Sequence, residues 1–352
     1  MPTINTRGAM SARGFGFGAS AAAGYAYLIM PDIAGTISAT TTLNSGGTTT
    51  LLKSGAYNQL SYYQPFLVLD GQVIASDNYY STNGGASYII YNGVNPISNT
   101  YAGGINCGGA YRSSSKTVVS LISNLTGKYT YGGFGYATPT TNGSVLWNIS
   151  AGSFVMSVVY SPALDVFVTQ DVYGNLRSYY GSSVTSLAGT NSFGSTGNYQ
   201  KMFISSDGYP IVYSFNGSNY NMNKIISADM LSYQNLGAQN DSYKGLTGQG
   251  AAVWSSTYGL YFKPATSTSA VYAVYSADAV NWTGIYLGAP YGGNSYPKTN
   301  IVVAPGEVNV MGIAYLPFGK SAGGYPYQLR STDGGSSWTT INKGITGTKN
   351  LQ

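Results

Sequence analysis

The sequence contains no histidine, one cysteine and one glutamate in 352 residues. Without histidine, the chain lacks a Ser-His-Asp or Cys-His catalytic arrangement, an imidazole base and a histidine-ligated zinc ion. The single Cys107 excludes an intrachain disulfide and a thiolate metal cluster. Its neighbours are Asn and Gly, so no nearby charge in the sequence would activate the thiol. We therefore expect neither a metal ion nor a cofactor.

Charged residues are also scarce, at 8% of the chain against about 25% in typical globular proteins. The net charge is +5, but the basic residues are scattered and no run of Lys or Arg exceeds one residue. Nucleic-acid binding requires clustered positive charge that displaces counterions, so we expect no nucleic-acid partner. The most apolar stretch, residues 154–168, is interrupted by polar residues and is too short to cross a bilayer, so we expect no membrane insertion.

The chain is instead rich in Gly (48 residues) and Tyr (34 residues), with many Ser, Thr and Asn residues. Tyr, Thr, Val and Ile favour strands, and Gly, Asn, Ser and Asp favour turns. The Glu-, Lys- and Leu-rich composition of helical proteins is missing. Hydrophobic residues make up 43% of the chain, which is enough for a large core. The composition therefore predicts an all-β fold.

An apolar strand, a polar turn and an alternating strand rich in Tyr and Val recur along the chain. Aligning the first strands at Met156, Phe203, Val253 and Val303 gives spacings of 47, 50 and 50 residues. A period of about 40 to 50 residues with several short strands per period is typical of a β-propeller. We predict a propeller over residues 21–352, with six clear units and one weaker unit, and hence six or seven blades.

Two further points about this architecture remain expectations. We expect a strand of the N-terminal region to pair with strands of the last repeat and close the ring. An extended β-sandwich or a β-helical fibre is the alternative, because the Thr-rich runs at residues 40–50 would suit either architecture.

Residues 1–20 differ from the rest of the chain, because glycines surround Phe15 and Phe17 and no alternation is long enough for an independently stable strand. We interpret this segment as an extended docking arm. Its Phe residues would insert into a neighbouring subunit, and Arg7 and Arg13 would bind carboxylates or carbonyls. A flexible terminus is the alternative. The following residues 19–30 are interrupted by Gly and Tyr, so we expect no secretory signal there.

The most specific motif is STDGGSSWT at residues 331–339, and a shorter relative lies at residues 276–283. A degenerate trace without Trp lies at residues 205–208. The motif resembles the Asp-box, the hairpin motif of sialidase-type and related propellers. In such a turn Asp accepts backbone N–H bonds, Gly tolerates positive φ and Trp packs against the hairpin. The resemblance implies structural roles, away from the axial site, for Ser276, Asp278, Trp282, Ser331, Asp333, Gly335 and Trp338.

Nothing in the motif implies sialidase activity. A sialidase needs three arginines that bind a carboxylate, a Tyr nucleophile with a Glu partner, and an Asp acid. Outside the N-terminal segment the arginines are Arg112, Arg177 and Arg330, and they fall in different repeats. The single glutamate, Glu307, lies in no catalytic motif. Other glycosidases need two carboxylates that flank the bond, whereas the Asp-Gly pairs here are typical of turns. We therefore expect no enzymatic activity, and glycan hydrolysis is the least favoured alternative.

The tyrosines are the largest surplus, and some stand in adjacent pairs, as at residues 62–63, 79–80 and 179–180. Adjacent residues of a strand point to opposite faces. Tyr offers contact area and a polar group for protein or sugar partners, but it also has high strand propensity and fills seams between sheets. The sequence leaves both roles open.

The composition and the opening RGAMSARGFGFG (residues 7–18) resemble structural proteins of bacteriophage tails. The resemblance implies a virion component, assembled in the host cytoplasm and associated with the tail. It would dock through residues 1–20 onto other tail or capsid proteins in a symmetric homo-oligomeric assembly, with the propeller exposed for protein or host-surface contacts. The alternative is a lectin-like propeller that binds a host-surface glycan.

Overall fold

The computed structural model describes strands and turns between residues 28 and 343, and the structural statements below concern these residues. The predicted arm residues Arg7, Arg13, Phe15 and Phe17 lie outside them. The described residues are 28–31, 37–41, 48–53, 67–69, 73–75, 79–81, 89–90, 105–112, 114, 117–123, 129–135, 144–149, 155–171, 174–180, 187–193, 202–215, 220–239, 252–255, 258–266, 271–288, 298–303, 311–316, 327–333 and 336–343.

The described strands form seven antiparallel sheets, each built from strands that follow one another in the chain. The first has three strands, β1 (Leu28–Pro31), β2 (Ile37–Thr41) and β3 (Thr48–Lys53). The next two have four each, β4 (Leu67–Leu69), β5 (Val73–Ala75), β6 (Tyr79–Ser81) and β7 (Ile89–Ile90), then β8 (Ile105–Arg112), β9 (Thr117–Ser123), β10 (Tyr129–Gly135) and β11 (Ser144–Ile149).

The remaining four sheets also have four strands each. They are β12 (Val155–Ser161), β13 (Val166–Asp171), β14 (Asn175–Tyr180) and β15 (Leu187–Ser192); β16 (Phe203–Ile204), β17 (Pro210–Phe215), β18 (Tyr220–Ile225) and β19 (Tyr233–Ala238); β20 (Val253–Ser255), β21 (Leu260–Thr266), β22 (Val271–Ser276) and β23 (Thr283–Gly288); and β24 (Lys298–Val303), β25 (Met311–Leu316), β26 (Tyr327–Ser331) and β27 (Thr339–Lys343).

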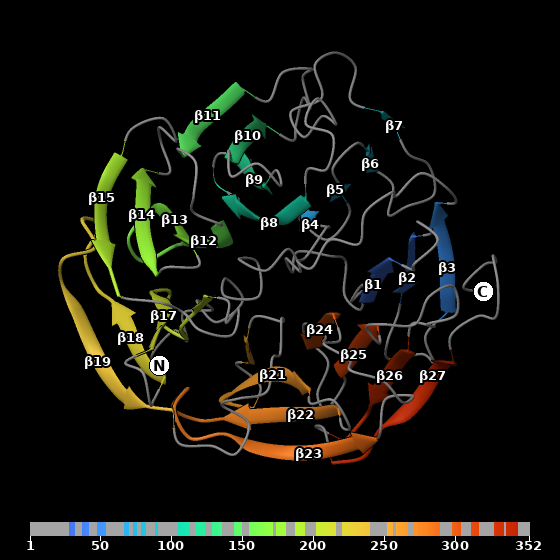
Figure 1. Cartoon of the computed structure of the whole chain (residues 1–352). Coiled ribbons are helices and arrows are strands. Elements are labelled where there is room, and N and C mark those ends of the chain that lie inside the picture. Colours follow the sequence, from blue (N-terminus) through green and yellow to red (C-terminus); the bar gives the residue numbers. More distant parts are fainter. Residues whose placement is uncertain are drawn as a thin grey trace, which may run out of the picture.

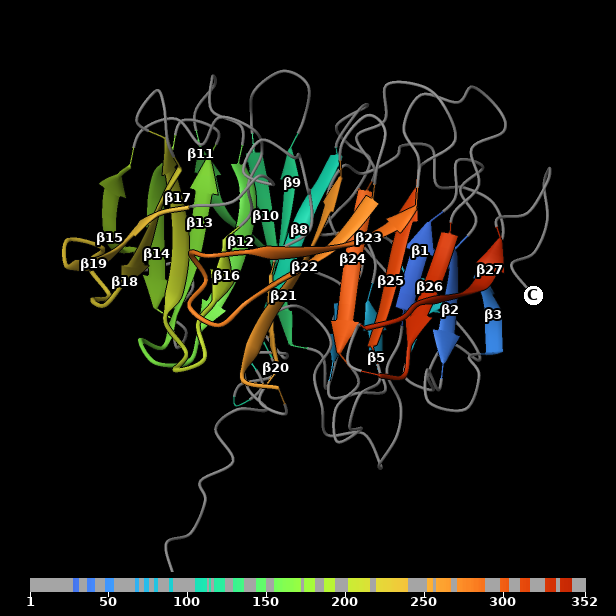
Figure 2. The ribbon, with the colours of Figure 1, turned by 90° about the horizontal axis from the view of Figure 1, so that it is seen from below.

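The sheets stand in a ring around a central axis, as in a β-propeller (Figure 1). The last strand of each sheet lies outermost in this view, and Figure 2 shows the strands side by side around the ring. The residues aligned in the sequence repeat lie in β12, β16, β20 and β24, the first strand of four successive sheets. The repeat therefore located one equivalent strand per sheet.

The burial of a strand follows its place in its sheet. All six residues of β13, the second strand of its sheet, are buried, so other parts of the protein cover both faces of this strand. In β19, the outermost strand of its sheet, no residue is fully buried. Aromatic contacts join neighbouring sheets, since the Phe203 ring lies 6.0 Å from Tyr213 in its own sheet and 5.7 Å from Tyr261 on β21. Burying each such ring contributes about 1.5–3 kcal/mol to folding.

The described strands show no exchange at the expected ring closure, and residues 1–27 lie outside them. β24–β27 pair only with one another, and β1–β3 form a sheet of their own that contacts β24 and β25 through β1. Strands joined by short loops pair with a lower entropic cost of loop closure than strands from opposite ends of the chain. At this seam, whole sheets therefore meet face to face.

The loop between β18 and β19 fastens its sheet to the preceding one. The Ser178 hydroxyl on β14 donates to the carbonyl of Ala228 at 2.5 Å. The Asn191 amide on β15 donates to the carbonyl of Met230 at 2.6 Å. These bonds satisfy carbonyls that a solvent-facing loop would leave to water. They also fix how the two sheets sit relative to each other.

A similar fastening joins the inner hairpins of the same two sheets. The Ser161 hydroxyl donates to the carbonyl of Gly208 at 2.8 Å, and the N–H of Ala163 donates to the same carbonyl at 3.3 Å. Deeper in the seam, the Gln170 side-chain amide donates to the carbonyl of Tyr213 at 3.2 Å. The two sheets are thus bonded at the inner hairpins, in the middle and at the outer turn.

Gly189 on β15 lies directly beneath the loop between β18 and β19, which generates a test of this seam. A Cβ atom at position 189 would meet the carbonyl oxygen of Asp229 at 2.2 Å. Because the obstacle is backbone, we expect Gly189→Ala to lower the free energy of unfolding by about 1–3 kcal/mol. Urea titration measures this change, with Thr190→Ala at the exposed neighbouring position as the control. Equal midpoints for the wild type and Gly189→Ala would contradict the packing described here.

Candidate functional site

Three turns with a common pattern join the third and fourth strands of three successive sheets. They are residues 227–233 between β18 and β19, 276–282 between β22 and β23, and 331–338 between β26 and β27. We call them Ser-x-Asp turns. The sequence motif located the second and third, but it missed the first because Tyr233 stands where the others have Trp. The spacing of 49 residues between Ser227 and Ser276 was the signal that could have located it.

In the turn at residues 276–282, one oxygen of the Asp278 carboxylate accepts hydrogen bonds from N–H groups of the turn. The Ser276 hydroxyl donates to Asp278 Oδ1 at 2.9 Å. The N–H groups of Val280 and Asn281 donate to the same oxygen at 2.9 and 2.8 Å, and the Asn281 side chain donates to Oδ2 at 2.7 Å. Ala279 has a φ of 64°, which reverses the chain inside this network. Short polar side chains stabilise turns in this manner.

Trp282 anchors the same turn to its own sheet. Its indole N–H donates to the carbonyl of Ala279 at 3.1 Å, and its ring is buried. The ammonium nitrogen of Lys263 on β21, also a buried residue, lies 4.1 Å from the centre of that ring. A desolvated cation–π contact of this kind contributes about 2 kcal/mol. The ring thus joins the outer turn to the second strand.

The turn at residues 331–338 is one residue longer but has the same network. The Ser331 hydroxyl and the Ser337 N–H each donate to Asp333 Oδ1 at 2.8 Å. The Ser337 hydroxyl donates to Oδ2 at 2.5 Å. Trp338 is partly buried against the hydrophobic core, and Gly335 lies outside the described residues.

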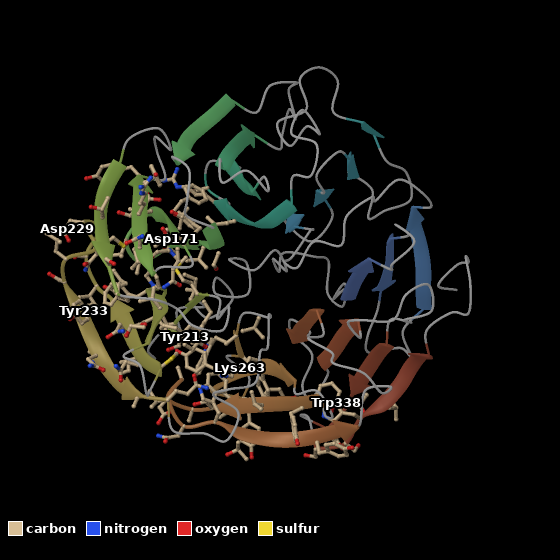
Figure 3. All side chains as sticks on the ribbon, viewed as in Figure 1. Asp171, Tyr213, Asp229, Tyr233, Lys263 and Trp338 are labelled. Atoms are coloured by element: carbon tan, nitrogen blue, oxygen red, sulfur yellow. The ribbon has the colours of Figure 1, made fainter. Side chains whose placement is uncertain are left out.

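The turn at residues 227–233 repeats the pattern in the preceding sheet. The Ser227 hydroxyl and the N–H of Leu231 donate to Asp229 Oδ1, the latter at 2.9 Å. The N–H of Ser232 donates to the Ser227 hydroxyl at 2.9 Å. Met230 has a φ of 65°, close to the 64° of its counterpart Ala279 in the second turn. Figure 3 shows Asp229 and Tyr233 at the outer rim of the ring.

The trace at residues 205–208 is not a fourth copy. It lies between β16 and β17, the first two strands of its sheet, whereas the Ser-x-Asp turns join third and fourth strands. The Ser205 hydroxyl donates to Asp207 Oδ1 at 2.6 Å and accepts the N–H of Tyr209 at 2.9 Å. Asp207 forms an ion pair with Lys224. The resemblance arises because Ser and Asp stabilise many kinds of tight turn.

The carboxylates of the Ser-x-Asp turns have low pKa values. Burial alone would raise the pKa of Asp278, but hydrogen bonds led by the N–H of Asn281 lower it to about 2. The Ser337 hydroxyl and N–H lower the pKa of Asp333 to about 2, and the hydroxyl of Ser227 lowers that of Asp229. A general acid needs a raised pKa, so these carboxylates are suited to holding turns and unsuited to donating protons.

Arg112, a candidate anion-binding residue in the sequence, is committed to a contact between sheets. Its guanidinium at the end of β8 donates to both oxygens of Asp165 at 2.7 Å, across to the hairpin between β12 and β13. The Tyr160 hydroxyl donates to Asp165 Oδ1 at 2.6 Å. Burial, followed by the bond to Asp165, raises the pKa of Tyr160 to about 12. Tyr160 therefore stays protonated and is no nucleophile at neutral pH.

The other two described arginines lie elsewhere in the ring. Arg177 lies on β14 and Arg330 on β26, the third strands of sheets that two further sheets separate (Figure 1). Glu307 lies outside the described residues. The described residues thus contain no arginine triad of the sialidase kind.

The remaining described carboxylate, Asp171, closes a hairpin. It accepts the N–H of Asn175 at 2.9 Å and the Asn175 side-chain amide at 2.8 Å, between β13 and β14. Within the described ranges, no three His, Cys, Asp or Glu side chains gather as a metal site would require. No helix in that part of the chain has the length and apolar character needed to cross a membrane.

Comparison with known proteins bears on the fold. No family model matches the sequence, and no curated protein is significantly similar. Among solved structures, the chain is similar to the β-propeller domain of Cps50 (Swd1) from Myceliophteria thermophila, with a TM-score of 0.50 and 11% sequence identity. The match covers 83% of this chain and 90% of that domain. At this identity the likeness shows the fold alone, and it confirms the predicted all-β propeller architecture.

The network around Asp278 predicts a pH-dependent stability difference. Asp278→Asn removes the charge that several donors share, so we expect the free energy of unfolding at pH 7 to fall by about 1 kcal/mol. Because the folded-state pKa of about 2 lies below the ordinary value of 3.8, the carboxylate stabilises the fold above that ordinary value. Its contribution is lost as the pH falls through the folded-state pKa.

Urea titrations of the wild type and Asp278→Asn between neutral pH and pH 2.5 (about half a unit above the folded-state pKa) measure this dependence. The difference between the two should narrow in the acid range. The exposed Thr283→Ser is the control and should show no pH-dependent difference. A gap that is the same at all pH values would show that the Asp278 charge contributes nothing to the turn.

Proposed function

We propose that this protein is a non-enzymatic structural component of a bacteriophage virion. In this proposal it associates with the tail, docks through residues 1–20 and leaves the propeller exposed for protein or host-surface contacts. The low charge and the Gly-, Ser-, Thr-, Asn- and Tyr-rich composition support a tail protein.

The observation that carries the non-enzymatic part of this proposal is the use of the carboxylates. Each of the six Asp side chains in the described part of the chain accepts hydrogen bonds that hold a turn or join two sheets. They are Asp165, Asp171, Asp207, Asp229, Asp278 and Asp333. A hydrolase needs a pair of carboxylates free to act on a bond, so this pattern favours a scaffold.

We further infer a ring of seven blades, one for each described sheet, with the Ser-x-Asp turns as its Asp-box hairpins. The regular position of the three turns, each between a third and a fourth strand, supports this assignment. A closed ring buries the faces of every sheet and leaves only short edges exposed, which suits a protein that must stay rigid within a particle.

A glycan-binding propeller is the second candidate, and the exposed tyrosines favour it. Tyr180 is exposed beside the buried Tyr179, and Tyr233 and Tyr286 are exposed on outermost strands. The rings of Tyr272 and Tyr286 meet edge to face with centres 5.7 Å apart, which presents a fixed aromatic surface. A glycan array separates the two candidates, because a pure scaffold shows no saturable binding.

The arm provides the test of the first candidate. We expect Phe15→Ala/Phe17→Ala to abolish incorporation into virions, because the two rings supply the apolar contact with the neighbouring subunit, while thermal unfolding of the propeller stays unchanged. Quantitative mass spectrometry of purified particles measures the incorporated copies. Thr3→Ala/Thr6→Ala in the same segment is the matched control and should incorporate normally.

Normal incorporation of the double Phe variant would contradict docking through the arm. Cross-linking of native particles supplies the second outcome. Cross-links from residues 1–20 to tail or capsid proteins support the virion role, whereas absence of the chain from any particle would overturn that role and leave the glycan-binding propeller as the better account.

A further inference from the structure

The Ser-x-Asp turn at residues 227–233 exposes apolar side chains that its relative buries. Leu231 and Tyr233 are 66% and 48% exposed, whereas their counterparts Val280 and Trp282 are 8% and 5% exposed. Ile226, directly before the turn, is 45% exposed. Large exposed apolar side chains that gather in one place mark interaction sites. We call Ile226, Asp229, Leu231 and Tyr233 the rim patch.

The exposure has a cause in the strand beneath. In the next sheet the Trp282 ring turns inward over the ammonium of Lys263. Counted back from the two turns through the strand registers, the position of Lys263 corresponds to Pro210 on β17, which offers no cation to an aromatic ring. Tyr233 instead meets the edge of Phe193 in the preceding sheet, with ring centres 4.9 Å apart. It therefore keeps half of its surface in solvent.

The carboxylate of the rim patch also differs from its counterparts. In the other two Ser-x-Asp turns the second carboxylate oxygen accepts a side-chain donor, from Asn281 and from Ser337. Asp229 Oδ2 accepts no hydrogen bond from the described residues, and the N–H of Ser232 at the equivalent position donates to the Ser227 hydroxyl rather than to the carboxylate. An exposed, ionised oxygen thus stands among three exposed apolar side chains.

The rim patch is held against the preceding sheet. The loop that carries it is bonded to the preceding sheet through Ser178 and Asn191, and Gly189 lies against its backbone. A surface that is already held in one geometry loses little conformational entropy when a partner binds.

The arm of the chain has the complementary chemistry. In an extended segment, Arg13, Phe15 and Phe17 point to one face at intervals of about 6.6–6.8 Å, and the glycines between them leave the other face bare. A guanidinium binds a carboxylate strongly, and two Phe rings match the apolar side chains beside it. β19 is the outermost strand of its sheet, and its outer edge pairs with no described strand, so an extended segment could add to it.

We propose that the rim patch is the docking site for residues 13–17 of a second copy of this chain, with Arg13 on Asp229 and the two Phe rings on Leu231 and Tyr233. This rests on the proposed function, because it takes residues 1–20 as the docking element. The arm precedes β1, which lies across the ring from β19 (Figure 1), so we take a second copy as the occupant, and the cross-linking below distinguishes it from the chain's own arm.

The experiment measures self-association of the full-length protein by analytical ultracentrifugation. Leu231→Arg places a charge beside the incoming Arg13 at a position too exposed to affect folding, and Arg13→Glu reverses the charge on the arm. We expect each to weaken association about tenfold or more. The double variant Arg13→Glu/Leu231→Arg, which places opposite charges on the arm and the patch, should recover part of the affinity. Tyr286→Ser, an exposed aromatic on the neighbouring sheet, is the matched control and should associate as the wild type does.

Three outcomes would overturn the proposal. The first is a monomeric wild type or association that Leu231→Arg leaves intact. The second is cross-links between arm and rim patch found only within single chains in a mixture of isotopically light and heavy protein, which would show that each arm docks on its own propeller. The third is a glycan that binds saturably and loses its affinity in Leu231→Arg while self-association persists, which would assign the patch to sugar.

Failure of this proposal and failure of the virion role are distinguishable. If particles incorporate Leu231→Arg normally but exclude Phe15→Ala/Phe17→Ala, the arm is still a docking element, but it binds another protein and not the rim patch. Particles that lack the chain altogether would overturn the virion role, whereas arm-dependent self-association in solution would still support the rim patch as the acceptor.

Discussion

The structure depends on hydrogen bonds that cross from one sheet to the next. A twisted sheet of four short strands cannot bury both of its faces alone, so each sheet is stable only when its neighbours cover it. Apolar contacts supply most of the stabilisation but do not fix the angle between sheets. The hydrogen bonds from Ser178 to Ala228 and from Ser161 to Gly208 fix that angle in one seam, the first at the outer turn and the second at the inner hairpin.

Several described charges hold sheets or turns in place. Arg112 and Asp165 join two sheets through a bidentate contact, and Lys224 pairs with Asp207 beside a hairpin. Lys263 lies buried under an aromatic ring. Ser, Thr, Asn and Tyr must therefore solvate most of the surface. In this chain with 8% charged residues, these described ionised groups stand at positions where they fix the geometry.

Composition and periodicity were enough to predict the all-β propeller. The repeat was visible because the first strands of several sheets lie in apolar stretches, such as FVMSVV and NIVV. The turn at residues 227–233 escaped the motif because a single Trp-to-Tyr difference removed its most conspicuous residue. The trace at residues 205–208 resembled the motif although it lies in another kind of turn, because Ser and Asp also stabilise unrelated turns. Arg112 and Asp165 are 53 residues apart, so no local sequence pattern could predict their ion pair.

Since every described sheet is made of strands that follow one another in the chain, each unit of roughly 50 residues carries all of the pairing information for its own sheet. Duplication or loss of one unit would leave every other hairpin intact and would alter only the two seams beside it. The number of sheets in such a ring can therefore change in evolution by whole units. What limits that change is the fit of the last described sheet against the first, between which no described strand is shared.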